Sequence, residues 1–90
     1  MNMALQVVRL GDKTSHGGVV ITASSTHSIA GIGIARVGDQ VACPIQGHGI
    51  NKIVEGAPTY TIDGRMVALH GHKSECGCTL IASSPNVTHE

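Results

Sequence analysis

Aromatic residues are almost missing from this chain of 90 residues. Tyr60 is its single aromatic residue, and Phe and Trp do not occur. Large aromatic side chains usually supply much of the buried area of a small core, and a chain of this length buries only roughly 60–65% of its unfolded surface. We therefore expect a thin aliphatic core that needs further stabilisation from a metal ion, disulfide bonds or a partner.

The chain also lacks an excess of charge of either sign. Six Lys and Arg residues balance six Asp and Glu residues, and charged residues make up only 13% of the sequence. Without a basic surface the phosphates of a nucleic acid have little to bind. We expect no nucleic-acid partner.

Long hydrophobic runs are absent as well. No run approaches the roughly 18 apolar residues of a transmembrane helix. The first ten residues lack the charged region and the apolar stretch of a secretory signal peptide. We therefore predict a chain with neither a membrane span nor a signal peptide.

An internal repeat is the most informative feature that is present. Its two clearest copies share two glycines and a cysteine, which are Gly31, Gly38 and Cys43 in one copy and Gly64, Gly71 and Cys76 in the next. Residues 38–43 are also echoed earlier by residues 11–16, and residues 54–58 are echoed later by residues 81–85. The chain therefore makes roughly three passes through one structural unit.

Each pass consists of short runs with a high β propensity. We predict strands over residues 19–22, 26–29, 32–37, 52–55, 59–62, 66–69 and 79–82. Frequent Gly and Pro residues and the lack of helical periodicity argue against helices. The Asp63-Gly64 pair suits a type I′ hairpin turn, and Ala30-Gly31 occupies the same place one unit earlier. The sequence predicts one all-β domain over residues 1–90, with a core from about residue 8 to residue 87.

Candidate metal ligands fall at the same phase of each pass. His16, Cys43 and Cys76 are equivalent by the repeat, so a pseudo-threefold arrangement would bring them together near one axis. His48 and His72 lie close to them in the sequence. Zn²⁺ takes four His or Cys donors in tetrahedral geometry, and an odd number of Cys residues favours thiols over a disulfide framework. We expect four of these five residues to bind zinc.

The remaining His and Cys residues receive other interpretations. Cys78 lies at the phase of Gly18 and Ile45, so we interpret it as a packing residue. His70 is expected to point away from the site and pack, and His27 and His89 are expected at the surface. The sequence contains no cofactor motif, nucleophile elbow or His-Glu-x-x-His. A zinc hydrolase would also need an open coordination position, which four protein donors would close, so we predict that the chain is not an enzyme.

Several ordered motifs resemble those of PAAR-repeat proteins, which cap the VgrG spike of the bacterial type VI secretion system. The motifs are RLGDKTSHGG (9–18), IARVGD (34–39), ACPIQGHG (42–49), IVEGAP (53–58) and VALHGHKSECGC (67–78). The resemblance implies a short cone of strands in three pseudo-threefold repeats with zinc near the vertex. Members usually hold the zinc with three His and one Cys, which carried onto this chain favours His16, His48, His72 and Cys76, with Cys43 in reserve.

The resemblance also implies a structural function. The chain would sharpen the spike for membrane puncture as a monomer that seats on one VgrG trimer, without a small-molecule substrate, and could link effector or adaptor proteins. It would reside in the bacterial cytoplasm before firing and leave the cell with the spike. The alternative is a free-standing zinc-stabilised β module that binds other proteins.

Overall fold

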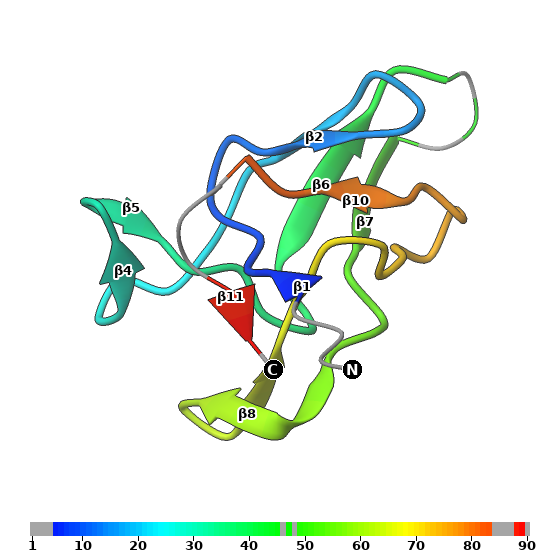
Figure 1. The fold of residues 1–90 in the computed structure, drawn as a ribbon. Helices are drawn as coiled ribbons and strands as arrows, with labels where there is room; N and C mark the ends of the chain where they lie inside the picture. Colours follow the sequence, from blue (N-terminus) through cyan, green and yellow to red (C-terminus); the bar gives the residue numbers. More distant parts are fainter. Residues whose placement is uncertain (1–4, 46, 48, 84–87, 90) are drawn as a thin grey trace.

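The structure is a computed structural model that describes residues 5–45, 47, 49–83 and 88–89, and within these residues all regular elements are short strands. The strands are β1 (Leu5–Gln6), β2 (Lys13–Thr14), β3 (Val19–Val20), β4 (Ser28–Ile29), β5 (Ile32–Gly33), β6 (Gln40–Cys43), β7 (Gly49–Lys52), β8 (Ala57–Ile62), β9 (Arg65–Val67), β10 (Leu80–Ile81) and β11 (Thr88–His89) (Figure 1). None of the described residues belongs to a helix that could cross a membrane. The prediction of an all-β domain is confirmed.

Five of the strands form a sheet that closes on itself. Their order is β10-β2-β3-β6-β7, and each neighbouring pair is antiparallel. Beyond β7, Ile53 pairs with Ser74, and the adjacent Lys73 pairs with Thr79 just before β10. These bridges join the two outer strands, so the sheet becomes a small closed ring. Closure removes the open edges that would otherwise invite pairing with other chains.

Three backbone hydrogen bonds around one axis unite the three passes. Val8 N–H donates to the carbonyl of Ala68, Ala35 N–H donates to Val8, and Ala68 N–H donates to Ala35, each at 2.9 Å. All three residues are fully buried. Because each pass donates to one neighbour and accepts from the other, the predicted pseudo-threefold arrangement is present in the structure.

The core follows the same pseudo-symmetry. Val20, Ile53 and Leu80 occupy equivalent places in the three passes and pack with the axial residues and Val41. This cluster contains only Val, Ala, Ile and Leu. Tyr60 packs at the border of a second cluster. The expected thin aliphatic core is therefore what the chain forms.

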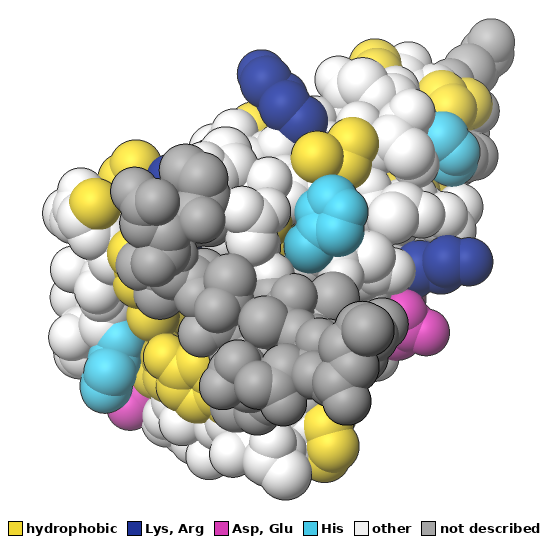
Figure 2. Space-filling model, viewed as in Figure 1, with side chains coloured by type: hydrophobic (Ala, Val, Ile, Leu, Met, Phe, Trp, Pro, Cys, Tyr) yellow, Lys and Arg dark blue, Asp and Glu magenta, His cyan; other side chains and the backbone are white. Residues whose placement is uncertain are grey.

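Three two-stranded sheets, β1–β11, β4–β5 and β8–β9, surround the other end of the axis. The turns of two of them match the sequence prediction, with φ of 54° and 82° at Ala30 and Gly31, and 54° and 80° at Asp63 and Gly64. Positive φ at both central residues is the mark of a type I′ turn. The molecule is broad at the end that carries these sheets and narrows toward the opposite end (Figure 2).

The strands differ from the predicted ones in several places. Strands β1, β2 and β11 were not predicted, and the strand predicted over residues 52–55 is found instead as β7 over Gly49–Lys52. Two further differences have a clear physical reason. Residues 40–43 form β6 with alternating burial, although their composition did not suggest a strand. The predicted strand over residues 32–37 ends at Gly33, because Ile34 and Arg36 leave the hairpin and form single bridges around the axis. Pairing with other strands decides both outcomes, for β6 with β7 of its own hairpin and β3 of the first pass, and local propensity does not report it.

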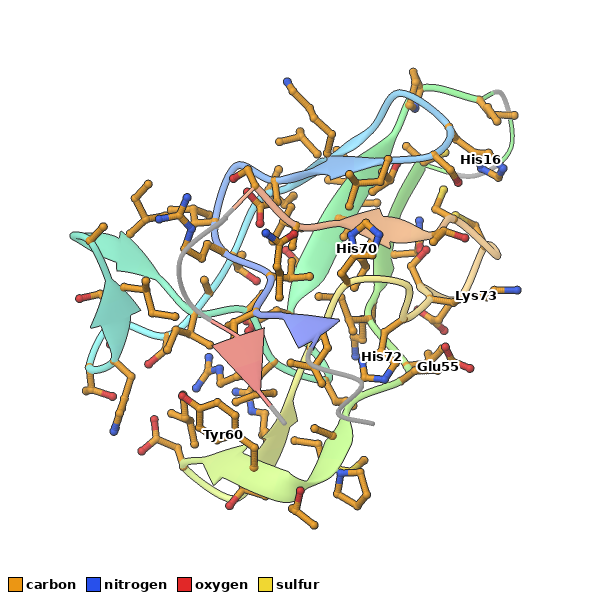
Figure 3. The ribbon with its side chains drawn as sticks, viewed as in Figure 1. His16, Glu55, Tyr60, His70, His72 and Lys73 are labelled. Atoms are coloured by element: carbon orange, nitrogen blue, oxygen red, sulfur yellow. The ribbon has the colours of Figure 1, made fainter. Side chains whose placement is uncertain are left out.

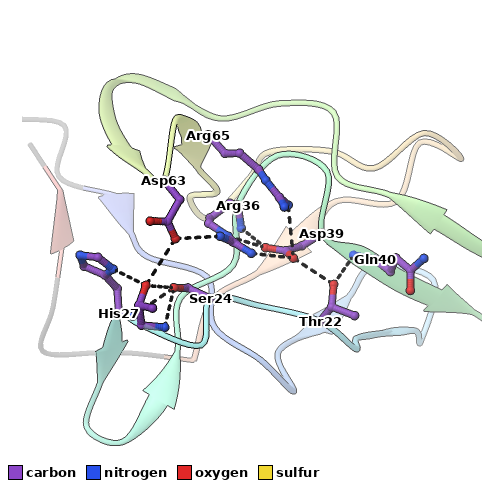
Figure 4. Close-up of polar contacts among 9 residues, drawn as sticks. Thr22, Ser24, His27, Arg36, Asp39, Gln40, Asp63 and Arg65 are labelled. Carbon is purple, nitrogen blue, oxygen red and sulfur yellow. Dashed lines mark hydrogen bonds and ion pairs between the residues drawn. The ribbon is translucent and has the colours of Figure 1, made fainter.

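In each pass a side-chain acceptor binds the backbone N–H of the residue three positions before it and so stabilises the turn. In the second pass Asp39 Oδ2 accepts from the Arg36 N–H at 2.8 Å and from Arg36 Nε at 3.1 Å, while Thr22 donates to Oδ1 at 3.0 Å (Figure 4). In the first pass Asp12 accepts from the Arg9 N–H at 2.8 Å. Since these N–H groups have no partner in a strand, the acceptor satisfies a donor that burial would otherwise leave unpaired.

We predict that Asp39→Ala lowers the free energy of unfolding by about 3–5 kcal/mol, because it leaves the buried Arg36 guanidinium without its main partner. Asp63→Asn is the matched control, since Asn removes the charge and tolerates the φ of 54° at this turn position. Asp63 also contacts Arg36, at 3.4 Å, but its side chain is 56% exposed compared with 4% for Asp39. Its loss should cost less than about 1 kcal/mol. Denaturant unfolding measures both values, and equal losses would contradict the assignment.

Candidate metal centre

The tips of three hairpins meet at the narrow end of the molecule. Thr14, Val41 and Ser74 are buried, equivalent residues that pair with Leu80, Val20 and Ile53. Two positions further along lie Cys43, at the end of β6, and His16 and Cys76, in the turns that follow Thr14 and Ser74. The shared register therefore brings all three to the tip.

Among the described residues, four donor atoms come together there. The side chains of His16, Cys43, Cys76 and Cys78 each offer one atom, and these atoms all lie within 4.8 Å of one another. Cys78 is the central member, because its Sγ lies 2.8 Å from His16 Nδ1, 3.0 Å from Cys76 Sγ and 3.4 Å from Cys43 Sγ. His16 Nδ1 and Cys43 Sγ are 3.9 Å apart.

The chemistry and spacing of this group suit a metal ion. All three cysteines are free thiols, and Cys43 and Cys78 are buried. One imidazole and three thiolates form one of the usual donor sets of structural zinc, whose Zn–S distance of about 2.3 Å corresponds to about 3.7 Å between sulfurs in a tetrahedron. The sulfur–sulfur separations of 3.0 and 3.4 Å are shorter than this, and all four donor atoms lie within 4.8 Å of one another. The group could therefore hold a metal ion with four protein donors.

Neighbouring polar groups hold the third hairpin tip in place. Cys76 N–H donates to Asn51 Oδ1 at 3.3 Å, and Ser74 Oγ lies 3.3 Å from Cys76 Sγ. In the first hairpin, Gly18 N–H donates to Thr14 Oγ1 at 3.0 Å. Contacts of this kind orient the residues that bind a metal.

The thiols differ in their readiness to ionise. Burial raises the pKa of Cys76, but hydrogen bonds with Ser74 and Cys78 outweigh this and lower it to about 6. Burial raises the pKa of Cys78 to about 12, and its hydrogen bonds with Cys76 and Cys43 act in the same direction. Without a metal the adjacent sulfurs therefore share protons, and a cation would favour the loss of the remaining ones.

The structure separates the predicted ligands into two groups. It brings His16, Cys43 and Cys76 together. His72 lies elsewhere, as Figure 3 shows, and its Nδ1 accepts the Leu69 N–H at 2.9 Å. In the third pass His72 thus accepts the turn N–H that Asp12 accepts in the first pass and Asp39 in the second. His48 lies outside the described residues.

Cys78 is the site residue that the sequence reasoning missed. It was aligned with Ile45 and interpreted as packing, yet the bridges of Val20, Ile53 and Leu80 make Asn51 its counterpart. The second hairpin is longer than the other two, which shifts the alignment of its returning strand. Cys78 is buried, but its sulfur also faces the cluster. The sequence signal that could have identified Cys78 as a candidate ligand is its position two residues after Cys76.

Two further histidines lie apart from the cluster. His70 is exposed and accepts the Ala82 N–H at 3.1 Å through Nδ1, so the expectation that it packs is wrong. His27 is exposed, as expected, and its Nδ1 lies 2.9 Å from Thr26 Oγ1. The side chain of His89 lies outside the described part of the chain.

Comparison with known protein families gives one match. The sequence profile of the PAAR motif matches residues 10–82, which include all four clustered residues. A search of curated protein sequences gives no match.

We predict that Cys78→Ser weakens metal binding by at least about 100-fold, because losing a ligand should cost more than losing a group that only orients one. His72→Asn is the matched control and should retain the metal, since an amide oxygen can accept the Leu69 N–H. Metal content by mass spectrometry and competition with a chelator measure both. Loss of metal from His72→Asn with retention by Cys78→Ser would contradict this ligand set.

The chain should also lose stability in mild acid through His72. Burial lowers the pKa of His72 below 6.5, while the Glu55 carboxylate acts in the opposite direction. The unfolded chain then binds this proton more readily than the folded chain, so the free energy of unfolding falls as the pH drops below 6.5. His72→Asn should show a smaller loss between pH 7.5 and 5.5 in denaturant unfolding. Identical losses in both proteins would exclude this role.

Proposed function

The chain belongs to the PAAR-motif family, and from this premise we propose that it forms the tip of a bacterial type VI secretion spike. In this proposal its broad end seats on the trimeric VgrG protein and its narrow end leads the spike toward the target membrane. The observation that carries the proposal is the joint presence of a pseudo-threefold base and a clustered donor set at the tip.

Zinc is the metal that we propose for the tip. Zn²⁺ accepts mixed imidazole and thiolate donors without redox chemistry of its own. His16 would link the first pass, Cys43 the second, and Cys76 with Cys78 the third, so a single ion would join all three hairpin tips. Structural zinc can contribute on the order of 10 kcal/mol to folding. This is a suitable stabiliser where the chain is too narrow to bury a core.

The base supports a partner with threefold symmetry. The sheets β1–β11, β4–β5 and β8–β9 are two-stranded and lie around the same axis as the hydrogen-bonded ring. One strand of each sheet already accepts a backbone hydrogen bond from a neighbouring pass, at Gln6 of β1, Gly33 of β5 and Met66 of β9. Strand addition by a partner would therefore build on three sheets that are joined to one another. A trimeric β-structured partner could offer one matching edge to each sheet, so one chain would bind one trimer.

The proposed role is mechanical, and four protein donors on one ion would leave no coordination position for a substrate. The chain would be assembled with the spike in the bacterial cytoplasm and leave the cell with it. Effector or adaptor proteins are further partners of such a tip in this proposal. The mechanical role is supported by the ring of axial hydrogen bonds, which connects the base to the tip.

The zinc-loaded chain should form a complex of one chain with one VgrG trimer, measurable by size-exclusion chromatography with light scattering. Ile32→Asp, on β5 at the broad end, should weaken binding by at least about 10-fold, because a charge would have to be desolvated in the interface. Ile50→Asp, an exposed residue of β7 near the tip, is the control and should bind normally. A zinc-loaded chain that stays apart from its VgrG would favour a free-standing module instead.

A further inference from the structure

The two cysteines of the third hairpin form a pair of their own within the cluster. Cys76 and Cys78 flank Gly77, whose φ of 87° turns the chain so that their sulfurs lie 3.0 Å apart. We propose that these residues form an oxidisable dithiol, which a hydroperoxide converts to a disulfide within the hairpin, with release of the metal. The inference rests on the metal site proposed above.

Distance and access both favour this pair. The Cys78 sulfur is 3.0 Å from Cys76 but 3.4 Å from Cys43, and a disulfide needs about 2.05 Å. A movement of about 1 Å therefore suffices for the closer pair. Cys76 is partly exposed, whereas Cys43 and Cys78 are buried. An oxidant in solution thus meets Cys76 first, with Cys78 directly behind it.

The chemistry needs only hydrogen peroxide and two protons. The Cys76 sulfur attacks one peroxide oxygen, the O–O bond breaks, and the departing hydroxide takes a proton to become water, which leaves Cys76 as a sulfenic acid. The Cys78 thiolate attacks this sulfur, the S–O bond breaks, and a second hydroxide leaves as water after protonation. Two thiolates are oxidised to one disulfide while the peroxide is reduced to two waters.

The position of the disulfide determines its effect. Both sulfurs belong to the third pass, so their bond links no other pass. Only His16 and Cys43 would remain as donors among the four clustered residues, which is too few for a structural zinc site. Oxidation would therefore remove the connection between the three hairpin tips, and a thiol reductant together with zinc would restore it.

The wild-type, zinc-loaded protein is treated with hydrogen peroxide, and zinc release is followed with a chromogenic chelator. Peptide mapping by mass spectrometry then locates the disulfide. We expect release of the bound zinc together with a Cys76–Cys78 disulfide, both reversed by a thiol reductant with added zinc. A disulfide of Cys43 with either Cys76 or Cys78, or zinc retained after oxidation, would overturn the proposal.

Cys76→His is the matched variant, because it copies the residue of the first pass, His16, and keeps four donors. It should bind zinc and release it at least about 10-fold more slowly in peroxide. Release at the wild-type rate would overturn the proposal. If the untreated wild-type protein bound no zinc, the metal site itself would fail. Oxidation of the metal-free protein would then test the dithiol alone, with any disulfide other than Cys76–Cys78 counting against it.

Discussion

The ring of hydrogen bonds among Val8, Ala35 and Ala68 is the constraint on which the rest of the structure depends. It fixes the three passes at equivalent heights around one axis. Because the register is shared, each hairpin tip reaches the same end of the molecule with its donor residue turned inward. The same register places three two-stranded sheets at the opposite end. Tip and base are thus two results of one set of main-chain contacts.

Much of this fold could be predicted from the sequence, since its signals are local. The Gly-Asp steps, the Asp63-Gly64 pair and their repetition predicted three passes with hairpin turns, and the structure has them. The closure of the five-stranded sheet could not be predicted, because it depends on bridges such as Ile53 to Ser74 between distant segments. Strand β6 was missed for the same reason. One of its partners, β3, belongs to another pass, and its own composition does not suggest a strand.

The candidate site was predictable to the extent that the repeat is regular. The shared phase of His16, Cys43 and Cys76 in the repeat predicted that they meet, and the structure brings them together. The longer second hairpin disturbed that phase for Cys78. His72 shows a second limit, because a sequence does not tell whether an imidazole nitrogen will meet a metal or a backbone N–H. Here His72 Nδ1 accepts the Leu69 N–H, at the turn position where the other passes have Asp12 and Asp39. Among the described residues the cluster holds one imidazole and three thiols, whereas the family resemblance implied three His and one Cys, of which His48 lies outside those residues.

The three flanks of the molecule are similar but unequal. Strand β8 has six residues, whereas β4 and β1 have two each, and His72 stands where the other passes carry Asp12 and Asp39. A single chain with three unequal passes lacks true rotational symmetry, even if it binds a symmetric partner. In the proposed assembly with a trimer, any feature of one flank would therefore occur once and not three times. A molecule that recognised the β8 flank would be recruited in a single copy, and its position would mark one direction around an otherwise uniform axis.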